Sequence, residues 1–333
     1  MTHLSWKEFT SFISTTTPTL SSFSTENPKK LSPHQASLTL NTLNLAPSHK
    51  IVTLAALKGG VGKTFLSTHV AVRASMLGIK VLIVDLDPEA CASNSLLSEE
   101  VLADSKKKTI YELLKTQIPF EEAIIPTRYP YLDILPSSLR VTRAEKIIMG
   151  RNPKSLLRRP LENLPYDLIL LELPPSFSTL CAAAYLAADR VIIPCTPNIH
   201  SLESVDLTLE AIREAAQEFE VPLMKINIVL NMFRSNRISS QDVYQILKND
   251  YGPQLITQCI SDSAEVLNAI NAGLTLYETS SRPSLREEMD VLVKEVIGLR
   301  PRTVANHSWA QPIKDSPLPL NFSHPLISPT LEQ

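Results

Sequence analysis

The middle of the chain alternates short apolar runs with longer stretches in which apolar residues recur every three or four positions. Nearly continuous apolar runs at residues 81–84 and 168–171 are typical of strands that are covered on both faces of a sheet. The runs predict strands over Ile51–Leu57, Lys80–Asp85, Leu132–Leu135, Leu168–Glu172, Arg190–Pro194 and Lys225–Asn231. The stretches between them predict helices over Lys63–Leu77, Arg140–Arg151, Phe177–Ala187, Leu202–Phe219 and Ser239–Asn249. This alternation predicts an α/β fold with a doubly wound, mostly parallel sheet that binds ligands at the carboxyl ends of its strands.

Both ends of the chain lack this pattern. Residues 1–49 contain 18 Ser or Thr and no Gly, and such sequences bury too little apolar surface to become ordered. We expect a largely disordered N-terminal extension in which Leu4–Ile13 has the pattern of a short helix. The chain becomes Pro-rich and aperiodic again beyond residue 301. The predicted organisation is an extension over 1–49, one domain over 50–300 and a disordered tail over 301–333.

Composition narrows the class of protein without identifying it. Hydrophobic residues make up 44% of the 333-residue chain, enough for a sizeable core, and the formal net charge is −2. This charge gives no general attraction to nucleic acid, so any such binding needs a local basic patch. The four cysteines lie far apart in the sequence, and no apolar run is as long as a membrane span. We expect a cytoplasmic protein with reduced thiols and no membrane contact.

A glycine-rich loop carries the strongest functional signal. The segment Lys58–Thr64 reads K-G-G-V-G-K-T and lies between a predicted strand and a predicted helix. Backbone N–H groups at a helix N-terminus bind phosphate, and residues without bulky side chains let the loop curl around it. In such a loop Lys63 reaches the β- and γ-phosphates and the Thr64 hydroxyl binds Mg²⁺. The predicted nucleotide-binding residues of the loop are Gly59, Gly60, Val61, Gly62, Lys63 and Thr64.

Acidic residues end two of the predicted strands. Asp85 and Asp87 follow the apolar run 81–84, and Glu172 follows the run 168–171. Because the carboxyl ends of parallel strands share one edge of a sheet, we expect these carboxylates beside the glycine-rich loop. Carboxylate oxygens are suitable ligands for Mg²⁺, which demands near-octahedral geometry.

The loop resembles the deviant Walker A signature of the ParA/MinD family, in particular the Soj-like ATPases of plasmid and chromosome partition. The distinguishing residue is the extra lysine, Lys58, and the likeness runs from about Lys50 to Gly298. The resemblance implies a P-loop NTPase fold, ATP and Mg²⁺ as cofactors, and a homodimer that sandwiches ATP between its subunits. It also implies catalytic roles for Lys58, which reaches the partner's phosphates, and for Asp87, which positions the attacking water.

The same resemblance assigns the remaining site residues. Asp85 matches the first acidic position of the family's D-x-D-P-Q motif and supports the Mg²⁺ shell. Glu172 stands where the family has aspartate, and its extra methylene moves the carboxylate outward, so we expect slow hydrolysis. Asn231 and Pro197 match positions that border the adenine, although either residue is also common where a strand simply ends.

The resemblance fails at the surface that family members use for nonspecific DNA binding. Two arginines of that surface correspond to Asp262 and Glu265 here, which opposes phosphate binding. Other basic groups remain, among them Arg234, Arg237, Lys106–Lys108 and Arg158–Arg159. DNA binding therefore stays an open question. The C-terminus is interrupted by prolines and lacks the basic amphipathic helix with which some family members bind membranes, so we expect no membrane binding.

The leading hypothesis is an ATP-dependent dimerisation switch for DNA partition, with weak ATPase activity that a ParB-like protein stimulates. A second hypothesis is a positioning ATPase whose cargo is a protein assembly, which the two acidic replacements favour. A third is a nucleotide-binding scaffold with little turnover, which Glu172 favours. The sequence identifies neither the cargo nor the role of the N-terminal extension.

Overall fold

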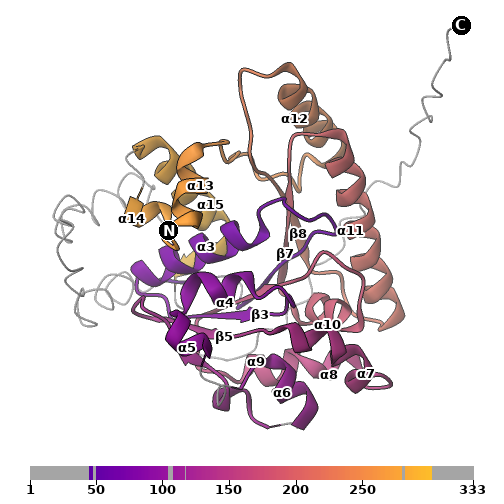
Figure 1. The fold of residues 1–333 in the computed structure, drawn as a ribbon. Coiled ribbons are helices and arrows are strands. Elements are labelled where there is room, and N and C mark those ends of the chain that lie inside the picture. The colour runs from indigo at the N-terminus through magenta and orange to yellow at the C-terminus, as the bar shows by residue number, and fades with distance from the viewer. Residues whose placement is uncertain (1–44, 48–49, 104–107, 117, 280–281, 302–333) are drawn as a thin grey trace, which may run out of the picture. The chain divides into compact units, whose positions relative to one another are not determined.

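The computed structural model describes residues 45–47, 50–103, 108–116, 118–279 and 282–301 (Figure 1). The predicted helix Leu4–Ile13 and nearly all of the two predicted disordered tails lie outside the described residues. So do Lys106 and Lys107.

A seven-stranded sheet forms the centre of the domain. Its strands are β2 (Ile51–Leu54), β3 (Val81–Asp85), β4 (Ile125–Pro126), β5 (Leu132–Leu135), β6 (Leu168–Glu172), β7 (Arg190–Cys195) and β8 (Lys225–Leu230). Their order is β4-β5-β3-β6-β2-β7-β8, and only β4 at the edge is antiparallel to its neighbour. All six predicted strands are present, and the predicted doubly wound, mostly parallel fold is confirmed.

Helices cover both faces of the sheet, as continuous apolar strands require (Figure 1). Alternate residues of β3 join different cores: Val81 and Ile83 pack on one side, Leu82 and Val84 on the other. The first core is completed by α3 (Lys63–Met76), α4 (Cys91–Leu96), α5 (Glu99–Ala103), α13 (Ala264–Asn271), α14 (Leu276–Thr279) and α15 (Pro283–Ile297). The second is completed by α6 (Ile110–Thr116), α7 (Ala144–Ile148), α8 (Pro153–Leu156), α9 (Arg158–Glu162), α10 (Thr179–Ala187), α11 (Ile199–Glu218) and α12 (Ile238–Tyr251).

The predicted helix Arg140–Arg151 is wrong as a single element. The structure has a 3₁₀ helix, η3 (Leu139–Arg143), followed by α7, and a turn at Gly150 with φ of +77° ends the pair. Val141, Ala144 and Ile148 are buried at helical spacing, which explains the pattern in the sequence. The short helices α8 and α9 and a second 3₁₀ helix, η2 (Phe120–Glu122), were not predicted.

A separate antiparallel pair lies close to both predicted domain boundaries. Strand β1 (Leu45–Pro47) pairs with β9 (Leu299–Pro301). The division at residues 49 and 301 therefore stays a prediction. Among the described residues, no helix combines the length and the apolar character needed to cross a membrane.

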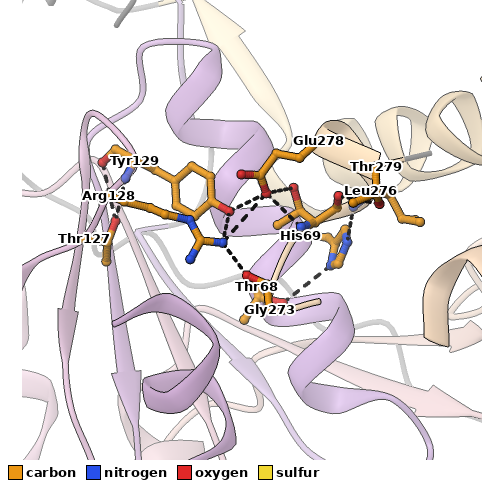
Figure 2. Close-up of polar contacts among 10 residues, drawn as sticks. Thr68, His69, Thr127, Arg128, Tyr129, Gly273, Leu276, Glu278 and Thr279 are labelled. Carbon is orange, nitrogen blue, oxygen red and sulfur yellow. Dashed lines mark hydrogen bonds and ion pairs between the residues drawn. The ribbon is translucent and has the colours of Figure 1, made fainter. Parts of the chain in front are cut away.

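A polar network holds α14 against the loop that precedes β5 (Figure 2). The Tyr129 hydroxyl donates to Glu278 Oε2 at 2.6 Å, and Arg128 donates to the Gly273 carbonyl at 2.6 Å. The Arg128 guanidinium also lies over the Tyr129 ring, 4.8 Å from its centroid. These contacts join the end of the domain to the edge of the sheet.

His69 on α3 completes this anchor and is held neutral. Its Nε2 accepts from the Leu276 backbone N–H at 3.0 Å (Figure 2). Nδ1 must therefore carry the proton, which it donates to the Phe65 carbonyl at 2.7 Å. Burial lowers the pKa of His69 to about 4. An unfolded chain has the ordinary pKa near 6.5 and binds this proton first as the pH falls.

We therefore expect stability to fall between pH 6.5 and pH 4. The contribution of His69 to this loss is about 3 kcal/mol, because each pKa unit corresponds to about 1.4 kcal/mol. Urea unfolding at several pH values measures it, with His69→Gln as the control because its amide oxygen can still accept from Leu276. An equally steep pH dependence in the variant would contradict this role for His69.

Candidate functional site

The glycine-rich loop connects the end of β2 to the N-terminus of α3, the geometry that binds phosphate. Gly60 and Gly62 have positive φ angles, +73° and +91°, which glycine adopts without strain. Leu66 N–H donates to the Gly62 carbonyl at 3.0 Å and starts the helix. A Cβ added at Gly59 or Gly60 would meet no atom within 4 Å. The loop backbone thus borders open space at a helix N-terminus.

Gly62 has a further constraint that the sequence does not reveal. A Cβ at this position would lie 2.2 Å from Nδ2 of Asn231. That amide donates to the Val61 carbonyl at 2.9 Å and so joins the end of β8 to the loop. Asn231 therefore contacts the loop itself, and its predicted pairing with adenine stays a prediction.

We expect Gly62→Ala to lower the free energy of unfolding by about 2–3 kcal/mol. The substitution combines a strained backbone angle with the loss of the Asn231–Val61 hydrogen bond. Urea unfolding without nucleotide measures the effect. The matched control is Gly59→Ala, whose Cβ has room and should change stability by less than about 0.5 kcal/mol. Equal stability of the two variants would contradict the steric argument.

Lys63, the first residue of α3, is buried, with 7% of its surface exposed. Its Nζ contacts the Ala56 carbonyl at 3.4 Å, within the loop's own backbone. Burial lowers the pKa of Lys63, and the nearby Glu172 and Asp87 carboxylates partly offset this. A buried ammonium at the base of a phosphate-binding loop is well placed to gain an anionic partner.

Glu172 reaches the loop despite replacing the expected aspartate. The Thr64 hydroxyl donates to Glu172 Oε1, and the Ser67 hydroxyl donates to Oε2 at 2.6 Å. Burial and the neighbouring Asp85 raise the pKa of Glu172. The Glu172 carboxylate thus contacts the predicted Mg²⁺ ligand Thr64 directly.

Asp85 and Asp87 lie beside Glu172 at the carboxyl edge of the sheet. Asp85 is the register partner of Glu172 in the β3–β6 pair. Its Oδ2 accepts from the Ser93 N–H at 2.9 Å and hydroxyl at 2.7 Å, and its Oδ1 accepts from Asp87 N–H at 3.1 Å. Burial raises the pKa of Asp85. Asp87 accepts from Glu89 N–H at 2.9 Å through Oδ1.

The donors in this edge suit Mg²⁺ held together with a nucleotide. One hydroxyl, on Thr64, and two carboxylates, on Asp85 and Glu172, are hard oxygen donors. Mg²⁺ usually takes one or two protein carboxylates and completes its shell with water and phosphate oxygens. Within the described ranges, no three His, Cys, Asp or Glu side chains form a metal cluster of their own.

Lys58 points away from its own loop. Its Nζ donates to Asn198 Oδ1 at 2.8 Å and to Ser201 Oγ at 3.0 Å, at the start of α11. Pro197 lies beside these residues, directly after β7. The Thr196 hydroxyl exchanges hydrogen bonds with the same group, at 2.6 Å to Ser201 and 2.8 Å to Asn198.

The structure gathers the predicted residues of the loop, Asp85, Asp87 and Glu172 into one site. The sequence analysis missed the hydroxyl and amide partners of these residues, Ser67, Ser93, Asn198 and Ser201. A serine one helical turn after Thr64 was a usable signal for Ser67. The other three partners are brought in by tertiary packing and had no local signal.

Comparison with known proteins supports this arrangement. Residues 49–228 match a family model described as an AAA domain, AAA_31. The chromosome partitioning protein ParA of Myxococcus xanthus is 28% identical over 238 residues, covering 70% of this chain and 83% of that protein. The chain belongs to the ParA/MinD family of deviant Walker A ATPases.

Two further members of the family show its range. The cell division protein PomZ of Myxococcus xanthus is 27% identical over 259 residues, covering 76% of this chain and 79% of PomZ. A putative plasmid partition protein of Borrelia burgdorferi, solved with bound AMPPNP, is 27% identical with a TM-score of 0.63. The match covers 74% of this chain and 97% of that one. These relatives place this ParA/MinD member among the P-loop ATPases.

Proposed function

We propose that the protein is an ATP-dependent dimerisation switch that acts in the partition of plasmid or chromosomal DNA. ATP and Mg²⁺ join two subunits face to face, and slow hydrolysis, stimulated by a ParB-like protein, releases them. The observation that carries this proposal is the position of Lys58. Its ammonium is held at the start of α11. It therefore lies apart from the phosphate-binding side of the loop, where Lys63 lies, and a second subunit can approach it there.

In the proposed dimer, each triphosphate contacts two lysine side chains, one from each subunit. Lys63 neutralises the phosphates of its own subunit, and Lys58 leaves Asn198 and Ser201 to reach those of the partner. A cation supplied in trans stabilises the charge of the transferring phosphoryl group, as arginine fingers do in other NTPases. The polar contacts that hold Lys58 in one subunit are hydroxyl and amide dipoles rather than carboxylates, so its release leaves no unpaired charge behind.

One observation favours a second candidate, a positioning ATPase whose cargo is a protein assembly. Asp262 pairs with Arg234 at 2.5 Å, so the acidic residue also neutralises a nearby cation that could face DNA. Glu265 adds a second acidic residue to the same surface. PomZ, which is 27% identical to this chain, is named as a cell division protein.

The solution mass tests the proposal. The proposal predicts a monomer without nucleotide and with ADP–Mg²⁺, and a dimer with ATP–Mg²⁺. Light scattering during gel filtration measures the mass, and Lys63→Ala serves as the variant that should not respond. Binding of ATP without a change of mass, accompanied by negligible turnover, would favour the third candidate, a nucleotide-binding scaffold.

A further inference from the structure

A strongly basic surface lies on the short helices that cover the second core. We call it the basic patch and define it as the exposed and partly exposed side chains of residues 139–159. This range contains seven Lys or Arg and a single acidic residue, Glu145, in a chain whose total charge is −2. The basic residues are Arg140, Arg143, Lys146, Arg151, Lys154, Arg158 and Arg159. They belong to η3, α7, α8, α9 and their connections, and the three α-helices all pack against α10 (Figure 1).

Three of these residues form a stripe along η3 and α7. Arg140, Arg143 and Lys146 recur at every third position and are exposed, whereas the opposite face of the same helices is buried in the core. A 3₁₀ helix rises about 2 Å per residue and an α-helix about 1.5 Å, so the stripe extends over about 10 Å. Duplex DNA presents about six phosphate charges over that length.

Several cations of the patch have no acidic partner in the described part of the chain. Arg140 pairs with Glu112 and Arg158 with Asp189. No ion pair within the described ranges involves Arg143, Lys146, Lys154 or Arg159. Their charge is therefore available to an anionic ligand.

Two exposed or partly exposed arginines on other surfaces form ion pairs. Arg73 pairs with Asp290 at 2.7 Å, and Arg234 pairs with Asp262 at 2.5 Å. The basic patch differs from these surfaces in its density of charge, with seven basic residues and one acidic residue over 139–159. Such a surface attracts polyanions despite a negative overall charge.

We propose that the basic patch binds the sugar–phosphate backbone of duplex DNA without sequence preference. The choice of DNA rests on the proposed role in partition. The patch would then replace the surface that carries Asp262 and Glu265. Phosphate contacts of this kind supply affinity and carry no sequence information.

Membrane and acidic-protein partners fit the patch less well. The large apolar side chains exposed within it are Leu139 and Met149, 74% and 77% exposed. Two such side chains on helices of five residues give little apolar surface for insertion among lipids. Protein interfaces likewise need a buried apolar or aromatic anchor, which a surface of long cationic side chains does not provide.

The test compares two double variants of the full chain. Arg143→Ala/Lys146→Ala removes charge from the patch, and Arg237→Ala/Lys248→Ala removes equal charge from the N-cap and the last turn of α12, where both residues are exposed. Fluorescence anisotropy with a random-sequence duplex, at several salt concentrations, gives the slope of log K against log salt. We expect the slope of the patch variant to fall by about two per bound subunit and that of the control to match the wild type.

Three outcomes would overturn the proposal: no binding of duplex by the wild type, equal slopes for the patch variant and the wild type, or loss confined to the α12 variant. Patch-dependent sedimentation with phosphatidylglycerol vesicles in place of DNA would also overturn it. Mass in ATP–Mg²⁺, measured on the same samples, separates this proposal from the switch. A dimer that ignores DNA contradicts the patch alone, and a monomer that binds DNA through the patch contradicts the switch alone.

Discussion

Lys58→Ala is expected to bind ATP almost as well as the wild type, to form a weaker ATP-induced dimer, and to lose turnover by about 10³-fold. The magnitude follows from the loss of arginine-finger cations in other NTPases, which lowers turnover by about 10³–10⁵-fold. ATP binding is retained because Lys63, not Lys58, lies on the phosphate-binding side of the loop, with its Nζ against the Ala56 carbonyl. Titration with a fluorescent ATP analogue and a phosphate-release assay measure the two quantities.

Lys63→Ala is the matched control for this prediction. Like Lys58→Ala, it removes one positive charge from the loop, but this charge lies on the phosphate-binding side. We therefore expect Lys63→Ala to lose nucleotide binding itself. Asn198→Ala supplies a second control, because it removes one acceptor of Lys58 and leaves the lysine intact. If Lys58→Ala weakened ATP binding as strongly as Lys63→Ala, the assignment of the two lysines to different subunits' phosphates would be contradicted.

Glu172→Gln is expected to lower Mg²⁺-dependent turnover by about 100-fold, while Glu172→Asp stays within about tenfold of the wild type. Groups that orient a metal site typically change affinity or activity by about 10–100-fold when they are removed. Gln keeps the shape; its amide oxygen can accept from one of the two hydroxyls, on Thr64 or Ser67, and its NH₂ group can donate to the other. The loss therefore reports mainly the removal of the negative charge. Turnover measured against Mg²⁺ concentration should show a higher requirement in Glu172→Gln.

Stability provides the control for this second prediction. Glu172 is buried beside Asp85, and its raised pKa means that burial and the neighbouring charge disfavour the carboxylate. The nucleotide-free Gln variant should therefore be at least as stable as the wild type at neutral pH. An unchanged Mg²⁺ requirement would show that this carboxylate does not serve the metal, and would favour the scaffold.

The parts of the fold that the sequence predicts are those with local patterns. Strands such as Leu168–Glu172 are continuous apolar runs, and the loop Lys58–Thr64 is a contiguous motif. Because parallel strands end at one edge, the meeting of Asp85, Asp87 and Glu172 also follows from the sequence. The structure adds that Glu172 contacts Thr64 directly, which side-chain length alone did not indicate.

The features that the sequence analysis missed depend on packing or on weaker signals. The contact of Asn231 with Val61 joins residues far apart in the chain, as does that of Lys58 with Asn198. The helix α15 was missed although it begins with Pro283 and ends before Gly298, whose φ is +54°. Proline at the start and glycine after the end are a known helix signature, so this signal was available.

The most direct test of the switch mixes two inactive variants, Lys58→Ala and Asp87→Ala. Both should bind ATP, and neither should hydrolyse it appreciably alone. If Lys58 acts on the partner's phosphates, a mixed dimer contains one complete site, made of Asp87 from one subunit and Lys58 from the other. At protein concentrations high enough for Lys58→Ala also to dimerise fully in ATP–Mg²⁺, half of the dimers in an equimolar mixture are mixed, so we predict recovery of about a quarter of the wild-type turnover. A mixture that stays at the background of the separate variants, although it dimerises, would contradict the account, because Lys58 would then act within its own subunit.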